Sequence, residues 1–360
     1  MIKQIAKKAL LLMAVLVGMT SFVAAEEQAN FDQGYPVDAS QMLGTYNAPA
    51  RYDVRGAWDV YFTGSFILWQ TIEQGLDLGM TSATDANANS SQIIHSSFNY
   101  KPGFKVSLGS NLGIDEWIAS LEYTFFHPKT SSSKSRVSSD PFTLVTFHDP
   151  HAGVTDSDLT KISSSWKLGI DLLDLSFARP CYIGTKLTIA PFFGVKGGWM
   201  HQRLHNHMYT ASYTYYAPSK ERTWLIGPRI GFNGNWLLDD GFRFYGNFAA
   251  SLFYQHFKQS LKEYYIAVGG TTYTYLLNLP SYINGLINPA IETTLGLAWG
   301  TYLWNNKMHL DLLAGYELQV FFNQNMMKVL EEENTSSYYA VPAPGDLMMH
   351  GLTVSLRLDF

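Results

Sequence analysis

The chain has 360 residues, of which 15% are aromatic and 15% charged, and its formal net charge is −5. This mildly acidic balance argues against a nucleic-acid-binding protein. Its one cysteine, Cys181, excludes an internal disulfide framework. No apolar run of about 18 residues follows the N-terminal segment, so the aromatic residues are expected in strands rather than in membrane-spanning helices.

The first 25 residues have the three-part pattern of a secretory signal. Three lysines come before and at the edge of an apolar run at 9–19, and small residues at 23–25 suit cleavage. The run is too short to span a bilayer as a helix. We therefore predict a signal peptide at 1–25 and, at 26–57, a polar, turn-rich periplasmic extension.

From residue 58 onward, apolar and polar residues alternate in one segment after another, with the two-residue period of β-strands. In the first segment Trp58, Phe62 and Phe66 share one face, and Asp59 and Tyr61 share the other. About ten strands are predicted in this way, at 58–68, 100–108, 117–125, 166–172, 183–196, 224–232, 242–255, 291–299, 308–320 and 351–360.

Short turns and long polar segments alternate between these strands. Short turns are expected at 113–115, 179–180, 238–241 and 304–307, and long loops at 71–97, 127–161, 201–221, 259–288 and 323–345. Transmembrane barrels have short periplasmic turns and long outer loops, whereas a soluble barrel has no reason to place every long loop at one end. Closure also removes exposed sheet edges and satisfies the backbone in lipid.

The predicted fold is therefore all-β. It is a transmembrane, antiparallel, up-and-down β-barrel of about 10–12 strands over residues 58–360, with long extracellular loops. Tryptophans near both ends fit two interfacial girdles. Those expected at the short-turn end are Trp58, Trp117, Trp236 and Trp304, and those at the long-loop end are Trp166, Trp199 and Trp224.

The last strand, Gly351 to Phe360, alternates strictly and ends on an aromatic residue. It resembles the terminal strand of bacterial outer-membrane barrels. That resemblance implies that Phe360 is part of a signal for the barrel-assembly machinery.

If the apolar faces meet lipid, the opposite faces define the interior. The predicted pore-lining residues are Lys105, Glu122, Lys167, Asp171, Lys186, Lys196, Arg229, Arg243, Glu292, Asp311, Glu317 and Arg357, and Asp59 and Asp359 share these faces. The two signs are balanced. Such groups must be hydrated or paired, because an unpaired buried charge costs several kcal/mol. A water-filled channel and a small lumen closed by salt bridges both satisfy this condition, since about eight strands are already filled by side chains.

Catalytic and metal-binding patterns are weak. The segment Gly109 to Gly113 departs from a Gly-x-Ser-x-Gly elbow, and no phosphate-binding loop is present. His201, His205 and His207 would share one face of a strand, which permits metal ligation, but Arg203 on that face opposes a cation. We predict that the protein is not an enzyme and has no metal site and no cofactor.

Several segments together resemble the Legionella-type major outer-membrane proteins, in particular those of Chlamydia-related bacteria. They are Trp58–Tyr61, Gly64–Gln70, Pro102–Val106, Trp117–Thr124 and Gly227–Gly231 before Trp236. The resemblance implies a pore-forming protein that is abundant at the cell surface. Classical chlamydial major proteins are cysteine-rich and cross-linked, whereas Cys181 stands alone here, so only a single intermolecular bond remains open.

The function expected from the sequence is that of an outer-membrane porin for passive diffusion of ions and small hydrophilic solutes. Its expected partners are outer-membrane lipid, the barrel-assembly machinery, the permeating solutes and, as an open question, further copies of the chain. Nucleic acid is not among them. The alternative is a surface adhesin or structural barrel with a closed lumen, in which the long loops bind a host molecule.

Overall fold

The computed structural model describes residue 54 and residues 58–83, 92–113, 115–136, 142–146, 159–270, 274–334, 337–342 and 344–360. The predicted signal peptide and nearly all of the predicted extension lie outside the described residues. Within the described ranges the regular structure is β-strand, and no helix there is long and apolar enough to cross a membrane.

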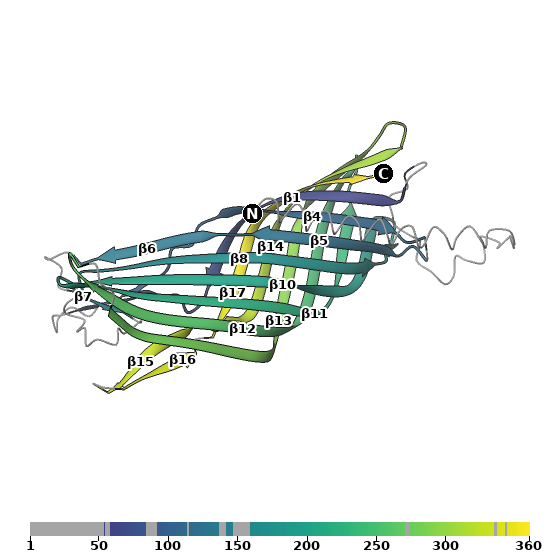
Figure 1. Ribbon diagram of the computed structural model, residues 1–360. Helices are drawn as coiled ribbons and strands as arrows, with labels where there is room; N and C mark the ends of the chain where they lie inside the picture. The colour runs from purple at the N-terminus through teal and green to yellow at the C-terminus, as the bar shows by residue number, and fades with distance from the viewer. Residues whose placement is uncertain are drawn as a thin grey trace.

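Ten antiparallel strands close into a barrel (Figure 1). They are β1 (Val60–Glu73), β4 (Lys101–Asn111), β5 (Ile118–Phe126), β8 (Lys161–Ala178), β10 (Leu187–Tyr209), β11 (Tyr213–Leu237), β12 (Phe242–Ala267), β13 (Thr274–Leu303), β14 (Met308–Asn325) and β17 (Gly345–Asp359). Each pairs with the next along the chain, and β17 closes the barrel on β1, with Ser65 opposite Ser355. The predicted up-and-down topology is confirmed.

Shorter strands lie in the segments that connect the barrel strands. β2 (Gly79–Ala83) pairs with both β3 (Gln92–Ile94) and β7 (Phe142–Thr146), β6 (Lys129–Ser135) pairs with β8, and β15 (Lys328–Asn334) pairs with β16 (Ser337–Pro342). All of them lie in segments predicted as long loops. A two-residue strand, β9 (Cys181–Tyr182), pairs with β10 at the opposite end.

Tight connections join β4 to β5, β8 to β10, β11 to β12 and β13 to β14, at the end where β17 finishes. The turn between β11 and β12 shows why it is short. Asp240 and Gly241 have φ of 50° and 81°, the left-handed backbone that a two-residue hairpin turn requires. The amide of Leu238 donates to the carbonyl of Phe242 at 2.9 Å.

At the other end, two predicted loops are strands instead. β10, β11, β12 and β13 run for 23, 25, 26 and 30 residues, so 201–221 and 259–288 are mostly extensions of barrel hairpins. The prediction failed there because outward apolar residues stop where the strands leave the lipid. The backbone ladder continues with polar side chains on the outer face. These extended hairpins reach toward the side of Figure 1 where β6 and β7 are labelled.

The outer face of the barrel carries an apolar band between two sets of exposed tryptophans. Trp58, Trp236 and Trp304 are exposed near the short turns, and Trp199 and Trp224 lie opposite each other near the outer end of the band. Trp166 does not belong to the girdle. It is 1% exposed inside the barrel and donates from Nε1 to Oε1 of Gln202 at 2.9 Å.

Candidate functional site in the barrel lumen

The interior face collects nine of the twelve residues predicted there. They are Lys105 on β4, Glu122 on β5, Lys196 on β10, Arg229 on β11, Arg243 on β12, Glu292 on β13, Asp311 and Glu317 on β14, and Arg357 on β17. Six of them are buried, and Glu122, Arg229 and Arg357 are half-buried. Arg229 and Arg357 pack against the rings of Phe192 and Tyr61, and Glu122 contacts Lys105. Alternation along each strand therefore gives the interior side correctly at these positions.

Three predicted interior residues lie elsewhere. On β8 the buried positions are Trp166, Leu168 and Ile170, so the exposed Lys167 and the half-buried Asp171 take the outer face. Asp171 accepts hydrogen bonds there from Tyr123 at 2.5 Å and is paired with His127 at 3.2 Å. The predicted face was wrong because the apolar side of this strand packs into the lumen rather than into lipid. Lys186 is exposed in the turn before β10.

The short-turn end of the lumen is an open cavity of about 610 Å³. Tyr61, Arg243, His309, Arg357 and Asp359 are among the residues that line it. Arg357 forms an ion pair with Asp359, with Nη2 2.5 Å from Oδ1, and its guanidinium stacks on the Tyr61 ring. Arg243 forms an ion pair with Asp311. This cavity is a charged, water-accessible vestibule.

A network of ion pairs forms the floor of the vestibule. Ser120 and Ser176 line the cavity, and each stands two residues along its strand from a network carboxylate, Glu122 or Asp174. Because side chains two residues apart share a face, the network lies directly beyond the cavity. Beyond the cavity, buried side chains occupy the lumen.

One half of the network is centred on Glu292. Lys196 Nζ lies 2.5 Å from Glu292 Oε1, and Arg229 Nη2 lies 2.9 Å from Glu292 Oε2. Asp174 completes the cluster, 2.9 Å from Arg229 and 3.9 Å from Lys196. Glu292, Asp174 and Lys196 are 7%, 6% and 3% exposed, so these charges face one another rather than water.

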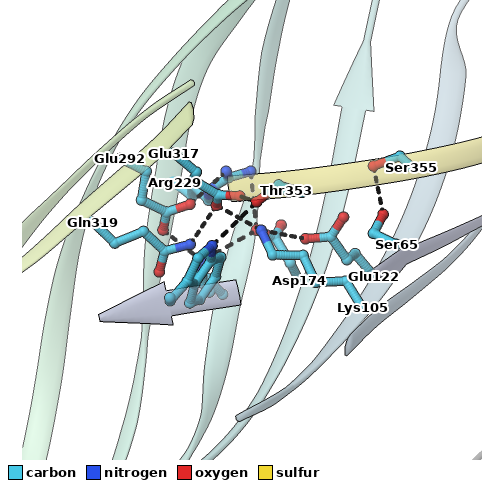
Figure 2. A network of polar contacts seen from close by, with 12 residues as sticks. Ser65, Lys105, Glu122, Asp174, Arg229, Glu292, Glu317, Gln319, Thr353 and Ser355 are labelled. Carbon is cyan, nitrogen blue, oxygen red and sulfur yellow. Dashed lines mark hydrogen bonds and ion pairs between the residues drawn. The ribbon is translucent and has the colours of Figure 1, made fainter. Parts of the chain in front are cut away.

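The other half is centred on Glu317 (Figure 2). Lys105 donates to Glu317 at 2.6 Å and lies 3.8 Å from Glu122. Thr353 and Gln319 donate to Glu317 at 2.8 and 2.7 Å. Trp69 caps this half, since its indole donates to Thr353 at 3.1 Å and its ring lies 5.0 Å from Lys105 Nζ. The two halves draw on β4, β5, β8, β10, β11, β13, β14 and β17, so the network crosses the lumen.

Beyond the network, the outer half of the lumen has an apolar core. Phe253 and Phe321 stack with ring centroids 5.9 Å apart, and Trp69 meets Phe126 edge-on at 5.4 Å. Further members, all buried, include Ile67, Ile170, Leu172, Met200, Leu225, Leu347 and Met349. Side chains packed in this way exclude water from the path.

Three polar atoms of the network have no hydrogen-bond partner in the protein. They are Arg229 Nε, Asp174 Oδ1 and Gln319 Oε1, counted among the described residues. Buried polar atoms of this kind are commonly completed by water. The network therefore has hydrogen-bonding capacity left for water from the vestibule side. Buried polar side chains also accompany the apolar core above it, and Glu73 Oε2 and Glu221 Oε1 have no hydrogen-bond partner among the described residues either.

Asp174, Thr353 and Trp69 were missed in the sequence as interior residues of the site. Asp171 and Asp174 stand an odd number of positions apart on one strand, so only one of them can face inward. The register between β5 and β8 could have identified Asp174 as the inward residue. Asp174 lies opposite Glu122, and residues opposite each other on paired strands point to the same face.

Other candidate groups remain outside the site. His201, His205 and His207 share the outer face of β10, as expected, but no group of three or more possible ligands among the described residues could hold a metal ion. Cys181 is half-buried, and its thiol donates to the carbonyl of Ile189 at 3.4 Å.

The model of one protein family, described as the Legionella pneumophila major outer membrane protein precursor, matches residues 52–360. No curated protein matches the sequence. Similar solved structures include the outer membrane protease OmpT from Escherichia coli, with 10% identity, 85% of this chain and 97% of that chain covered, and a TM-score of 0.35.

Two further similar structures are the translocator domain of the autotransporter NalP from Neisseria meningitidis and a Pseudomonas aeruginosa FadL homologue. The NalP domain is 12% identical, covers 95% of this chain and 98% of its own, and has a TM-score of 0.32. The FadL homologue is 7% identical, covers 84% of this chain and 89% of its own, and has a TM-score of 0.28. At these TM-scores the likenesses carry no argument about function.

Proposed function

The chain belongs to the Legionella pneumophila major outer membrane protein family and is an outer-membrane β-barrel, and we propose that its resting lumen is sealed and that it acts through its surface hairpins. The observation that carries this proposal is the sequence of layers inside the barrel. The vestibule ends at the ion-pair network, and beyond it the lumen is packed with the apolar core and with buried polar side chains such as Gln202 and Gln255.

The outer end supports a role at the cell surface. The segments beyond the apolar band are built from hydrogen-bonded strands, including the extended ends of β10 to β13 and the β15–β16 hairpin. Folded hairpins present a defined surface with little ordering entropy left to lose on binding. The proposal includes export by the predicted signal peptide and recognition of Phe360 by the assembly machinery, and it assigns no enzymatic activity.

A second candidate function is a diffusion pore for small hydrophilic solutes and ions. The charged vestibule and the hydrogen-bonding capacity left at Arg229 and Asp174 favour it. Permeation would then require the apolar core around Phe253 and Phe321 to move aside. The two candidates differ in what the unperturbed barrel lets through.

Solute uptake by intact cells tests the proposal. We expect a porin-deficient host that displays the mature chain in its outer membrane to hydrolyse an added hydrophilic β-lactam, by its periplasmic β-lactamase, no faster than the host alone. Lysed cells give the total enzyme as a control, and a heat-modifiable band confirms the folded barrel. A several-fold rise toward the rate of a porin-containing host would instead establish the pore.

A further inference from the structure

The outer face of the barrel carries a row of cations immediately above the outer tryptophans. Cross-strand pairing places Lys129, Lys167, Arg203 and Lys220 side by side on β6, β8, β10 and β11. In the next row toward the membrane, Arg222 on β11 lies opposite Lys258 on β12. All six side chains are exposed, and together they are called the basic belt.

The basic belt has no acidic counterpart among the described residues. None of its six side chains forms an ion pair with a carboxylate there, and Lys258 instead lies over the Tyr282 ring at 5.3 Å. On β11 and β12 the carboxylates Glu221 and Glu263 point inward and are 1% and 3% exposed. Asp171, on the outer face of β8, is paired with Tyr123 and His127 rather than with a cation of the belt. In Lys220-Glu221-Arg222 the alternation therefore sends both cations out and the acid in.

The arrangement is unfavourable for the isolated protein. Like charges directly opposite each other on neighbouring strands are destabilising. Four such pairs occur in the belt: Lys129–Lys167, Lys167–Arg203, Arg203–Lys220 and Arg222–Lys258. The same positive potential acts on His205, just above Arg203, where burial and then Lys220, Lys167 and Arg203 lower the pKa of the imidazole.

The height of the belt identifies the anion that would relieve this repulsion. Arg222 and Arg203 stand two and four residues beyond the exposed Trp224 and Trp199. A rise of about 3.3 Å per residue on a strand tilted by about 40° places them roughly 5 and 10 Å above the girdle, within the headgroup layer. Below them, Ile226 and Tyr254 continue the exposed apolar wall on which acyl chains would lie.

We propose that the basic belt is a binding site for a phosphorylated lipid of the outer leaflet, with the phosphates held between Arg203, Lys220 and Arg222 and the acyl chains against the apolar band below. Arginine in particular suits bidentate contacts with phosphate oxygens. A soluble anion would use the cations alone, whereas a lipid also uses the continuous wall beneath them.

Binding is tested with the full-length mature barrel in phosphatidylcholine vesicles that contain diphosphorylated lipid A or its enzymatically dephosphorylated form. We expect the phosphorylated lipid alone to raise the unfolding temperature, followed by heat-modifiable gel mobility, and the Lys167→Gln/Lys220→Gln variant to bind it at least tenfold more weakly. The matched control, Lys186→Gln/Lys307→Gln, removes two exposed cations from the short-turn end and should bind as the wild type does.

The change in stability that the Lys167→Gln/Lys220→Gln variant shows without the phosphorylated lipid provides a second readout. In pure phosphatidylcholine the Lys167→Gln/Lys220→Gln variant should be at least as stable as the wild type, because three like-charge pairs are relieved. Equal stabilisation by the dephosphorylated lipid, or unchanged binding by this variant, would overturn the proposal. Displacement of the lipid by millimolar inorganic phosphate would also overturn it, because the site would then bind free anions.

Discussion

Replacing Glu292 by glutamine is expected to lower the free energy of unfolding of the barrel by about 3–5 kcal/mol. Glu292 is the shared acceptor of Lys196 at 2.5 Å and Arg229 at 2.9 Å. The amide leaves the buried Lys196 and the half-buried Arg229 with Asp174 as the carboxylate of their cluster. Urea unfolding of the protein in lipid vesicles, followed by tryptophan fluorescence, measures the change.

The size of this effect separates a sealed lumen from a hydrated one. In a water-filled channel the same ion pairs would be screened, and Glu292→Gln would change stability by about 1 kcal/mol or less. Asp239→Asn, in the exposed turn before β12, is the matched control, with an expected change within about 0.5 kcal/mol. Adding Lys196→Met to Glu292→Gln should recover part of the loss, as a double-mutant cycle with a coupling of about 0.5–3 kcal/mol.

The second large effect is expected in the apolar layer. Phe253→Ala together with Phe321→Ala removes two stacked rings that are 0% and 1% exposed. Because the rings are stacked, the two voids should adjoin and weaken the packed layer above the ion-pair network. We expect discrete conductance steps in planar bilayers from this variant, at a stability cost of about 3–5 kcal/mol for each ring.

A lipid-facing phenylalanine provides the control for this experiment. Phe248→Ala removes a ring of the same size from the outer face of β12, where it is 39% exposed, and should leave the bilayer silent. If the double variant does not fold, the single Phe253→Ala variant opens half of the void and should give shorter, rarer openings. Silent bilayers from a folded double variant would show that these rings do not seal the lumen.

The barrel itself could be predicted from the sequence because lipid imposes a strict alternation on each spanning strand. The band from Leu187 to Trp199 on β10 shows this well, since its outward residues are apolar and its inward ones include Lys196. Where strands leave the lipid, that constraint ends. The outer hairpins of β10 to β13 were therefore predicted as loops, although their backbone pairing continues.

The face of a strand is harder to predict when its apolar side packs into the lumen instead of into lipid. On β8 the residues Trp166, Leu168 and Ile170 follow the same period as lipid-facing residues elsewhere, yet they pack in the lumen. Only the register with neighbouring strands fixes the side, and register depends on contacts far apart in sequence. The apolar core of the lumen was missed for the same reason, because its members look like membrane-facing residues.

The sequence could likewise predict that the lumen charges form salt bridges, but not which residues pair with one another. A balanced set of interior acids and bases predicts salt bridges, because neither sign is stable alone in a narrow lumen. The sharing of Glu292 between Lys196 and Arg229 depends on three strands meeting at one height. Alternation within each strand contains no information about that height.

Single-channel conductance of the purified, refolded wild-type barrel in planar bilayers, with a salt gradient across the membrane, tests the sealed lumen most directly. The ion-pair network and the apolar core predict a folded, heat-modifiable protein that inserts without discrete conductance steps. Regular steps with a defined reversal potential would contradict the sealed lumen and establish the diffusion pore.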